Sequence, residues 1–228
     1  MRPSSLVLLS GGLDSYASFH WASQNTDLVG GLFVNYGQKA SQKELEAAKN
    51  ICVRYDVKFR VVELPFFSQF SHSSLTNANQ VLPELSEGDL DNLIATRQSA
   101  DSVWVPNRNG ILINVAAAFA ENELVDLVVV GFNAEEAQTF PDNSNDFVKG
   151  INEALSFSTR HQVQVAAPMG DKNKLEIVKW LIEEEADLSL LWSCYLGDEK
   201  MCGLCESCQR LKRALKNGGG ESWLPKLF

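Results

Sequence analysis

Six consecutive residues near the start of the chain, Ser10-Gly11-Gly12-Leu13-Asp14-Ser15, have the composition of an anion-binding turn. They follow the apolar run 6–9, which is typical of a strand buried on both faces of a parallel sheet. Glycines let the backbone turn sharply, and Asp14 or Ser15 is expected to cap the helix that follows. Because N–H groups at a helix start attract anions, the turn predicts a phosphate site.

The hexapeptide matches SGGxDS, so the chain resembles the PP-loop ATP pyrophosphatases at this point. The Walker motif and the GxGxxG turn of dinucleotide folds are both absent from the sequence. The resemblance implies that ATP is cleaved between its α- and β-phosphates and that AMP passes to a substrate oxygen. It implies that the ATP-binding residues are Leu9, Ser10, Gly11, Gly12, Leu13, Asp14, Ser15, Tyr16, Ala17, Ser18 and Phe19.

A second apolar run, 28–35, ends in Tyr36-Gly37-Gln38. Ligands of open α/β sheets sit at the carboxyl ends of the strands, so Tyr36 and Gln38 are expected to border the nucleotide. A plain turn is the alternative.

Arg108 begins a helix that is predicted by apolar residues between 111 and 119. A guanidinium is electrostatically disfavoured at a helix N-terminus, so this placement suggests an anionic ligand that both share. An ion pair with one of the many acidic residues is the alternative.

The most continuous β run, 125–132, is expected to be a central strand, and an acid-rich loop follows it. Acids at that position hold Mg²⁺ or accept hydrogen bonds from a purine-like ring, on which Phe140 can stack. A solvated loop with a Pro-Asp turn is the alternative. The expected substrate-binding residues are Arg108, Asn109, Asn133, Glu135, Glu136, Phe140, Pro141 and Asp142.

Four of the five cysteines are crowded near the C-terminus: Cys194, Cys202, Cys205 and Cys208. Four thiolates at these spacings close a tetrahedral Zn²⁺ site and leave no position for water, so one structural zinc ion is expected. An Fe–S cluster is the alternative. Clustered cysteines fit a metal site in a reducing compartment better than a disulfide framework, which favours the cytoplasm.

Strand and helix patterns alternate along the chain, which predicts an α/β fold with a doubly wound, mostly parallel sheet. Residues 1–187 are expected to form the nucleotide-binding domain of PP-loop type, and residues 188–228 a small zinc-binding helical segment. Ser41 and Glu44 have the spacing of a capping box, Cys52 is expected in the core, and Gly218 should end the last helix and free a short tail. Residues 68–102 lose periodicity, which is typical of a lid or a disordered insertion.

The formal net charge of −9, with no basic arm, argues against a nucleic-acid partner and favours a small-molecule substrate. The sequence has no apolar run of the roughly 20 residues that a spanning helix needs, so no membrane partner is expected. A homodimer is compatible with this interpretation.

The stretches SGGLDS, NYGQ, VPNRN and GFNAEEAQTFPD, with Lys174 and the cysteine cluster, resemble the 7-cyano-7-deazaguanine synthase (QueC) family almost end to end. The resemblance implies that 7-carboxy-7-deazaguanine, ammonia and ATP give the nitrile preQ0 for queuosine and archaeosine biosynthesis. It implies a ligase in which Mg²⁺, the phosphate loop and the catalytic residues Asp14, Ser15, Arg108 and Lys174 orient the anions and shield their charge.

Two positions depart from the usual family pattern. Asn107 replaces a glycine, and Phe140-Pro141-Asp142-Asn143 replaces a Tyr-Pro-Asp-Cys stretch found in many members. Both border the expected base site, so two alternatives stay open. Relatives in antiphage gene clusters are thought to join a deazaguanine to a protein amine, and a zinc-stabilised nucleotide sensor would have no turnover.

Overall fold

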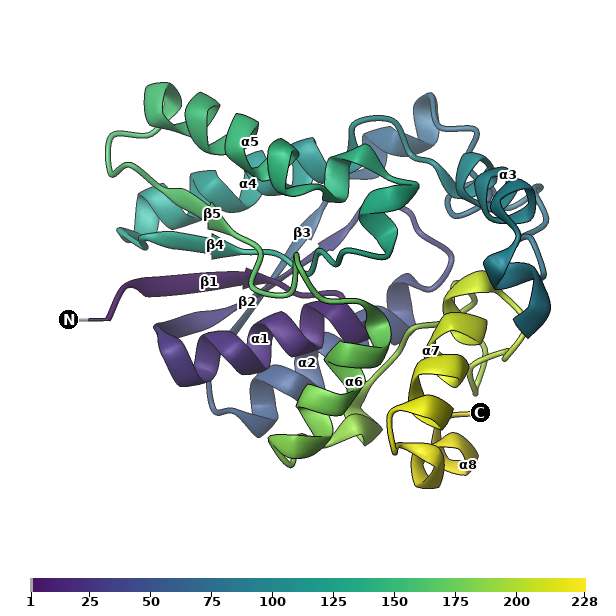
Figure 1. Ribbon diagram of the computed structural model, residues 1–228. Helices are drawn as coiled ribbons and strands as arrows, with labels where there is room; N and C mark the ends of the chain where they lie inside the picture. Colours follow the sequence, from purple (N-terminus) through teal and green to yellow (C-terminus); the bar gives the residue numbers. More distant parts are fainter. Residues whose placement is uncertain (1) are drawn as a thin grey trace.

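A five-stranded parallel sheet with the order β3-β2-β1-β4-β5 forms the centre of the molecule (Figure 1). The computed structural model describes residues 2–228. The strands are β1 (Ser4–Leu8), β2 (Asp27–Asn35), β3 (Lys58–Glu63), β4 (Leu127–Val129) and β5 (Gln164–Ala166). The chain winds from β1 outward to β3 and then to the other side through β4 to β5, which confirms the doubly wound sheet.

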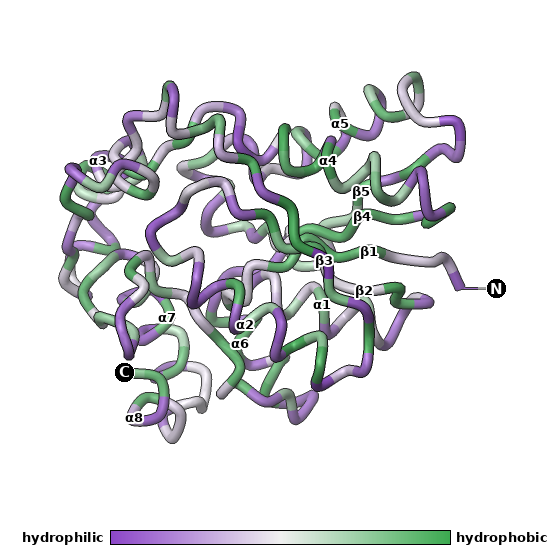
Figure 2. Tube along the Cα trace, turned by 180° about the vertical axis from the view of Figure 1, so that it is seen from behind, coloured by the Kyte–Doolittle hydropathy of each residue, from purple (hydrophilic) through white to green (hydrophobic). Residues whose placement is uncertain are grey.

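Helices cover both faces of this sheet (Figure 1). One face carries α1 (Leu13–Asn25), α2 (Ser41–Arg54) and α6 (Lys174–Glu183), and the other carries α4 (Arg108–Glu123) and α5 (Asn145–Ser158). Neighbouring strand residues take opposite sides: Val7 packs under α1, whereas Leu6 packs under α4. The strands need apolar residues at successive positions for this reason, and Figure 2 shows hydrophobic stretches along the central strands.

β4 is shorter than the expected run and lies between β1 and β5, so it is interior to the sheet, while β1 holds the middle position. Cys52 is fully buried in the core, as expected.

Two expected helix caps are wrong. α1 begins at Leu13 with Gly12 as its N-cap, so Asp14 and Ser15 lie in its first turn instead of before it. Ser41 is the first residue of α2, one position past the N-cap. In both cases the acidic side chain is engaged elsewhere: Asp14 pairs with Lys174, and Glu44 accepts a hydrogen bond from Gln38 Nε2 at 2.8 Å.

The segment 68–102 is folded and contains all but the last residue of α3 (Leu93–Val103), a helix that we did not predict because its apolar residues form no continuous stripe. It docks on the C-terminal segment: the Leu85 N–H donates to the Leu204 carbonyl at 3.0 Å, and Asp91 pairs with Arg213 at 2.7 Å. Its role as a lid stays a prediction.

The C-terminal segment contains α7 (Glu206–Asn217) and α8 (Leu224–Leu227). Gly218 ends α7 as predicted, but the tail is not free, since Leu227 is buried and Lys212 Nζ lies 4.7 Å from the ring centre of Phe228. Leu211 and Leu215 of α7 share one apolar cluster with α1 and α6. The division at residue 187 stays a prediction. Among residues 2–228, no helix is long and apolar enough to cross a membrane.

Candidate active site

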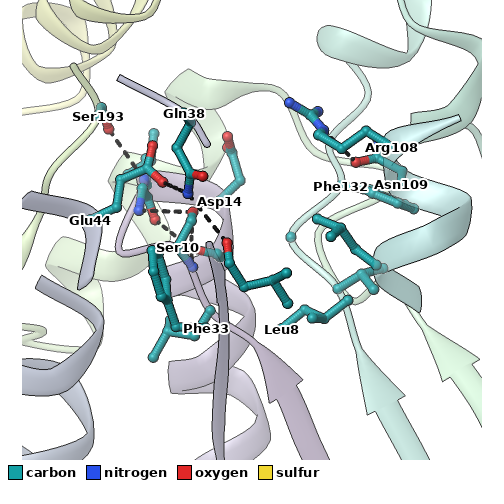
Figure 3. A pocket seen from close by; sticks show the side chains of 18 of the residues that line it. Leu8, Ser10, Asp14, Phe33, Gln38, Glu44, Arg108, Asn109, Phe132 and Ser193 are labelled. Carbon is teal, nitrogen blue, oxygen red and sulfur yellow. Dashed lines mark hydrogen bonds between the residues drawn. The ribbon is translucent and has the colours of Figure 1, made fainter. Parts of the chain in front are cut away.

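A cavity of about 230 Å³ lies at the carboxyl ends of β1, β2 and β4, where the strand order reverses (Figure 3). Seven stretches of the chain contribute to its wall. The residues that carry polar or aromatic groups into the wall are Ser10, Asp14, Ser15, Phe33, Tyr36, Gln38, Glu44, Arg108, Asn109, Phe132, Glu136, Asn143, Lys174, Trp192, Ser193, Tyr195 and Ser207.

Glycine is required at two positions where the phosphate loop, residues 10–15, packs against other segments of the chain. Gly11 has a φ of +83°, and a Cβ there would lie 2.5 Å from Ala47 Cβ. A Cβ at Gly131, just after β4, would lie 2.5 Å from the Ser15 backbone nitrogen. The first turn of α1 therefore packs directly against the chain that leaves β4.

Hydroxyl groups tie the phosphate loop together. Ser15 Oγ lies 3.1 Å from Ser10 Oγ and donates to the Gly12 carbonyl at 3.1 Å. From the C-terminal segment, Ser193 Oγ accepts the Leu13 N–H at 3.3 Å, and the Trp192 N–H donates to the Gly11 carbonyl at 2.9 Å. The loop is thus held by its own side chains and by the segment that carries the cysteines.

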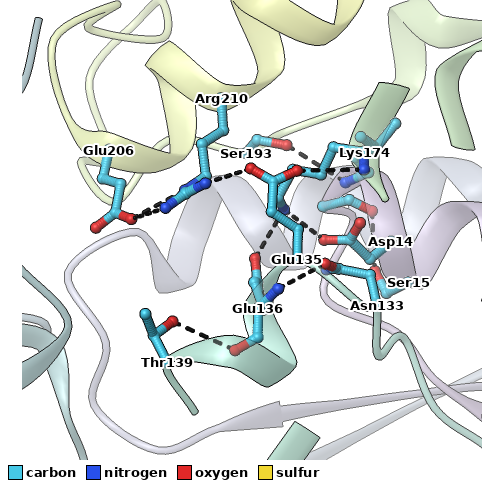
Figure 4. Close-up of polar contacts among 12 residues, drawn as sticks. Asp14, Ser15, Asn133, Glu135, Glu136, Thr139, Lys174, Ser193, Glu206 and Arg210 are labelled. Carbon is cyan, nitrogen blue, oxygen red and sulfur yellow. Dashed lines mark hydrogen bonds and ion pairs between the residues drawn. The ribbon is translucent and has the colours of Figure 1, made fainter. Parts of the chain in front are cut away.

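Lys174 joins two carboxylates at the base of the cavity (Figure 4). Its Nζ lies 2.8 Å from Asp14 Oδ2 and 2.7 Å from Glu136 Oε1, and the residue is only 5% exposed. Burial raises the pKa of Asp14 to about 6, against the opposing effect of Lys174. Burial alone would raise the pKa of Glu136 and lower that of Lys174. The attraction of Asp14 and Glu136 nevertheless raises the pKa of Lys174, and the attraction of Lys174 lowers that of Glu136.

Arg108 lies across the cavity from Gln38 and Glu44 (Figure 3). Its Nη1 donates to Tyr36 Oη at 3.3 Å and its Nε to Asn109 Oδ1 at 3.2 Å. Among residues 2–228, no carboxylate oxygen lies within 4.0 Å of the Arg108 guanidinium, so the alternative of a direct ion pair is not found. The cation is available to an anionic ligand.

The cavity wall contains only some of the residues that the sequence predicted to form the site. Most of the predicted ATP-binding set lines the cavity: Leu9, Ser10, Gly12, Leu13, Asp14, Ser15, Tyr36 and Gln38. Tyr16, Ala17, Ser18 and Phe19 are instead fully buried within α1, beneath the loop and away from the cavity wall. Gly11, which packs against Ala47, is also outside the lining, and a contact of these five residues with ATP stays a prediction.

The predicted base site is divided in the same way. Arg108, Asn109 and Glu136 line the cavity, and the buried Asn133 orders the turn by accepting the Glu136 N–H at 2.9 Å. Asn133 itself and four further members of the predicted set are outside the lining: Glu135, Phe140, Pro141 and Asp142. The ring of Phe140 lies parallel to that of Trp104, with 6.2 Å between centroids, and the Asp142 carbonyl accepts a hydrogen bond from Asn109.

Several lining residues were missed. Glu44 was assigned to a helix cap, yet it faces the cavity, and burial raises its pKa to about 7. Trp192, Ser193 and Tyr195 come from the stretch before the cysteines. Ser193 and Tyr195 flank Cys194 in the sequence, which was the available signal for these two. The position of this stretch beside the phosphate loop depends on long-range packing, so no local pattern predicts it.

Four cysteines meet in the C-terminal segment: Cys194, Cys202, Cys205 and Cys208. Their Sγ atoms lie within 4.8 Å of one another, and a tetrahedral zinc with bonds of about 2.3 Å needs sulfur separations of about 3.8 Å. Backbone N–H groups of Leu196 and Cys202 donate to Cys194 Sγ at 3.3 and 3.4 Å, which stabilises a thiolate. The cysteines are clustered to hold a metal ion, and zinc fits this donor set.

Comparison with known proteins gives one consistent result. The family model described as "Queuosine biosynthesis protein QueC" matches residues 4–219. Proteins named 7-cyano-7-deazaguanine synthase are similar over almost their whole length. The protein from Methanosarcina mazei is 44% identical over 94% of each chain, and that from Carboxydothermus hydrogenoformans is 48% identical over 92% of this chain and 96% of its own.

Among solved structures, a tRNA thiolase, NcsA of Methanococcus maripaludis, determined with its 4Fe–4S cluster, covers 97% of this chain and 70% of its own with a TM-score of 0.51. Its 16% identity supports the shared fold alone. The family match and the synthase relatives show the family as well as the fold. This result is consistent with the phosphate loop, with an Arg108 that has no carboxylate partner, and with the four-cysteine cluster. The chain belongs to the QueC family of queuosine biosynthesis proteins.

Proposed function

We propose that this protein is a ligase that makes 7-cyano-7-deazaguanine from 7-carboxy-7-deazaguanine, ammonia and ATP in queuosine biosynthesis. The observation that carries the proposal is one cavity with a phosphate loop on one wall and an arginine free of carboxylate partners on another. That pair suits a reaction between a nucleotide phosphate and a substrate carboxylate. Family membership and the named relatives support the same substrate.

In the proposed reaction, Arg108 orients the substrate carboxylate, one oxygen of which attacks the α-phosphorus of ATP and displaces pyrophosphate. Ammonia then attacks the activated carbon, so AMP leaves and an amide forms with loss of a proton. The amide oxygen then attacks the α-phosphorus of a second ATP and displaces pyrophosphate, and loss of AMP with the two N–H protons leaves the nitrile. The phosphate loop and Lys174 would offset the negative charge that develops on the phosphates.

Asp14 would take part in holding Mg²⁺. Its Oδ1 is buried and finds no hydrogen-bond partner among residues 2–228, and a carboxylate oxygen is a preferred ligand of that ion. Bound there, Mg²⁺ would neutralise phosphate charge. Zinc, held by the four cysteines, would act structurally, because a four-thiolate shell leaves no position for a substrate.

The remaining assignments belong to the same proposal. Asp142 and Phe140 would approach the deazaguanine only after the loop 133–142 shifts toward the cavity. Residues 68–102 would act as the lid. Five cysteines without a disulfide suit the reducing cytoplasm, and a homodimer would be the assembly tested first.

Mass spectrometry of the purified protein incubated with 7-carboxy-7-deazaguanine, ATP and ammonium tests the reaction. We expect the nitrile, with two AMP and two pyrophosphate released for each product. An accumulated amide or a protein adduct would support the antiphage-type reaction instead. Unchanged ATP would support the sensor. Arg108→Gln should abolish nitrile formation, whereas Arg54→Gln, which changes an exposed arginine at the end of α2, serves as its matched control.

A further inference from the structure

Two consecutive carboxylates separate two hollows of the molecule. Glu136 lines the 230 Å³ cavity and pairs with Lys174, whereas Glu135 lines a second hollow of about 920 Å³ between α3, the start of α6 and α7. Lys174 borders both hollows. The short turn at 135–136 is therefore the partition between the active-site cavity and the outer hollow. Figure 4 shows the side chains of Glu135 and Glu136 on this turn, with Arg210 and Lys174.

Arg210 of α7 holds the outer side of this partition. Its Nη1 pairs with Glu135 Oε1, and its Nη2 and Nε donate to Glu206 Oε1 at 2.7 and 2.9 Å. The Arg210 side chain is 10% exposed, that of Glu206 6% and that of Glu135 19%. A guanidinium that is fixed by one carboxylate of its own helix presents its other edge in one direction, so Glu135 is held in one place.

The helix that carries Arg210 begins in the cysteine cluster. Cys205 is the N-cap of α7, and Cys208 lies in its first turn, two residues before Arg210. The cysteine cluster is therefore linked to the partition through Arg210, and at longer range through Arg213 of the same helix, whose Nη2 lies 3.6 Å from Glu135 Oε1.

The partition has little freedom to absorb a displacement of Glu135. The Ala134 N–H donates to the Lys172 carbonyl at 2.9 Å, and the Glu136 N–H donates to Asn133 Oδ1 at 2.9 Å. Because Glu135 and Glu136 share a peptide bond, releasing the first side chain changes where the second meets Lys174. Lys174 in turn meets Asp14 of the phosphate loop at 2.8 Å.

We propose that Arg210 is a positioning residue for the reaction: by anchoring Glu135 it fixes the turn that places Glu136, and thereby Lys174, against the phosphate loop. The effect on turnover rests on the proposed function, in which Lys174 faces the phosphates. The mechanical link itself does not depend on that function.

Steady-state kinetics of Arg210→Gln test the effect on turnover, with Lys216→Gln as the matched control. Lys216 lies on the same helix but pairs with Glu87 of the insertion. We expect Arg210→Gln to lower kcat about 10- to 100-fold, as a misplaced group does, with KM values for ATP and base within about threefold. The control should keep the wild-type kcat, and both variants should keep one zinc per chain.

A double-mutant cycle tests whether Arg210 acts through Glu135. In a Glu135→Gln background, Arg210→Gln should lower kcat by less than about twofold further, because the link is already broken. Arg210→Lys keeps the positive charge but loses the planar guanidinium that binds both carboxylates, so its kcat should lie between those of Arg210→Gln and the wild type. This variant replaces Arg210→Gln in the cycle if Arg210→Gln does not fold. Additive losses, or a loss that follows zinc content, would overturn the proposal.

Hydrogen exchange of the ligand-free protein separates this inference from the proposed reaction. Arg210→Gln should speed exchange in peptides covering 133–138 and 172–176 and leave β1 and β2 unchanged. If the wild-type protein makes no nitrile but this pattern appears, the proposed function fails and the positioning link stands. Unchanged exchange at 133–138 in a folded Arg210 variant would overturn the link whatever the reaction is.

Discussion

Replacing Lys174 with Met should destabilise the ligand-free protein strongly, because it leaves two buried carboxylates without their cation. The side chains of Lys174, Asp14 and Glu136 are 6%, 13% and 31% exposed. Removing one partner of a buried ion pair costs about 3–5 kcal/mol. For a chain of this size, about 2–4 °C of Tm corresponds to each kcal/mol, so Tm should fall by roughly 6–20 °C near pH 8.

The Tm loss of Lys174→Met should depend on pH in one direction. The pKa of Asp14 is raised from 3.8 to about 6 in the folded protein, so its protonation favours folding fully below pH 3.8, and this contribution is lost as the pH rises through about 6. Lys174 lowers the pKa values of Asp14 and Glu136, and without it both carboxyls take up protons more readily. The Tm difference from wild type should therefore be largest at pH 8 and shrink toward pH 5.

Thermal unfolding followed by circular dichroism at pH 5, 6.5 and 8 measures the effect. Lys172→Met is the matched control: it removes a lysine two positions earlier that makes no ion pair within residues 2–228. Adding Asp14→Asn to Lys174→Met should restore part of the lost Tm at pH 8, since it removes one unpaired charge. A Tm within about 2 °C of wild type at pH 8, or a loss that is equal at every pH, would refute the buried-cluster argument.

Three further outcomes follow from the site. Ser15→Ala should abolish pyrophosphate release with little change in Tm, because it removes the hydroxyl that joins Ser10 to Gly12; full activity would contradict a phosphate loop. Cys202→Ser should lower both the zinc content and Tm, and stoichiometric iron in the wild-type protein would show that the metal was misassigned. Asp142→Asn should raise KM for 7-carboxy-7-deazaguanine about 5- to 150-fold, the equivalent of about 1–3 kcal/mol, with ATP affinity unchanged by calorimetry; the reverse pattern would make Asp142 a Mg²⁺ ligand.

The sheet and the phosphate loop were predictable because their signals are local. Leu6 and Val7 pack on opposite faces, so an unbroken apolar run was enough to predict a doubly buried strand. α3 gave no such signal, because Leu93 and Ile94 are exposed. The helix is held instead by the short turn Glu87–Asp91, which itself packs on α7, and by Val103, which is buried with Phe67.

The cavity wall was predictable only where a wall residue adjoins a strand end. Glu44 lies several residues past β2, and its spacing from Ser41 also fits a capping box, so only the packing of α2 against Gly11 reveals its position. Glu135 meets Arg210, about 75 residues further along the chain, whereas the N–H of Glu136 donates to Asn133 and its carboxylate meets Lys174. None of these partners is marked in the local pattern.

The departure at Asn107 has a conformational explanation. Asn107 is the N-cap of α4 with φ +53° and ψ +25°, the left-handed region that glycine favours and that asparagine tolerates best among other residues. Gly110 makes room for it, since a Cβ there would lie 2.3 Å from Asn107 Oδ1. Asparagine in place of the usual glycine therefore keeps the turn that puts Arg108 at the start of α4, on the cavity wall. Because this departure leaves Arg108 in place for its proposed contact with the substrate carboxylate, Asn107 does not by itself favour a protein conjugate over the nitrile.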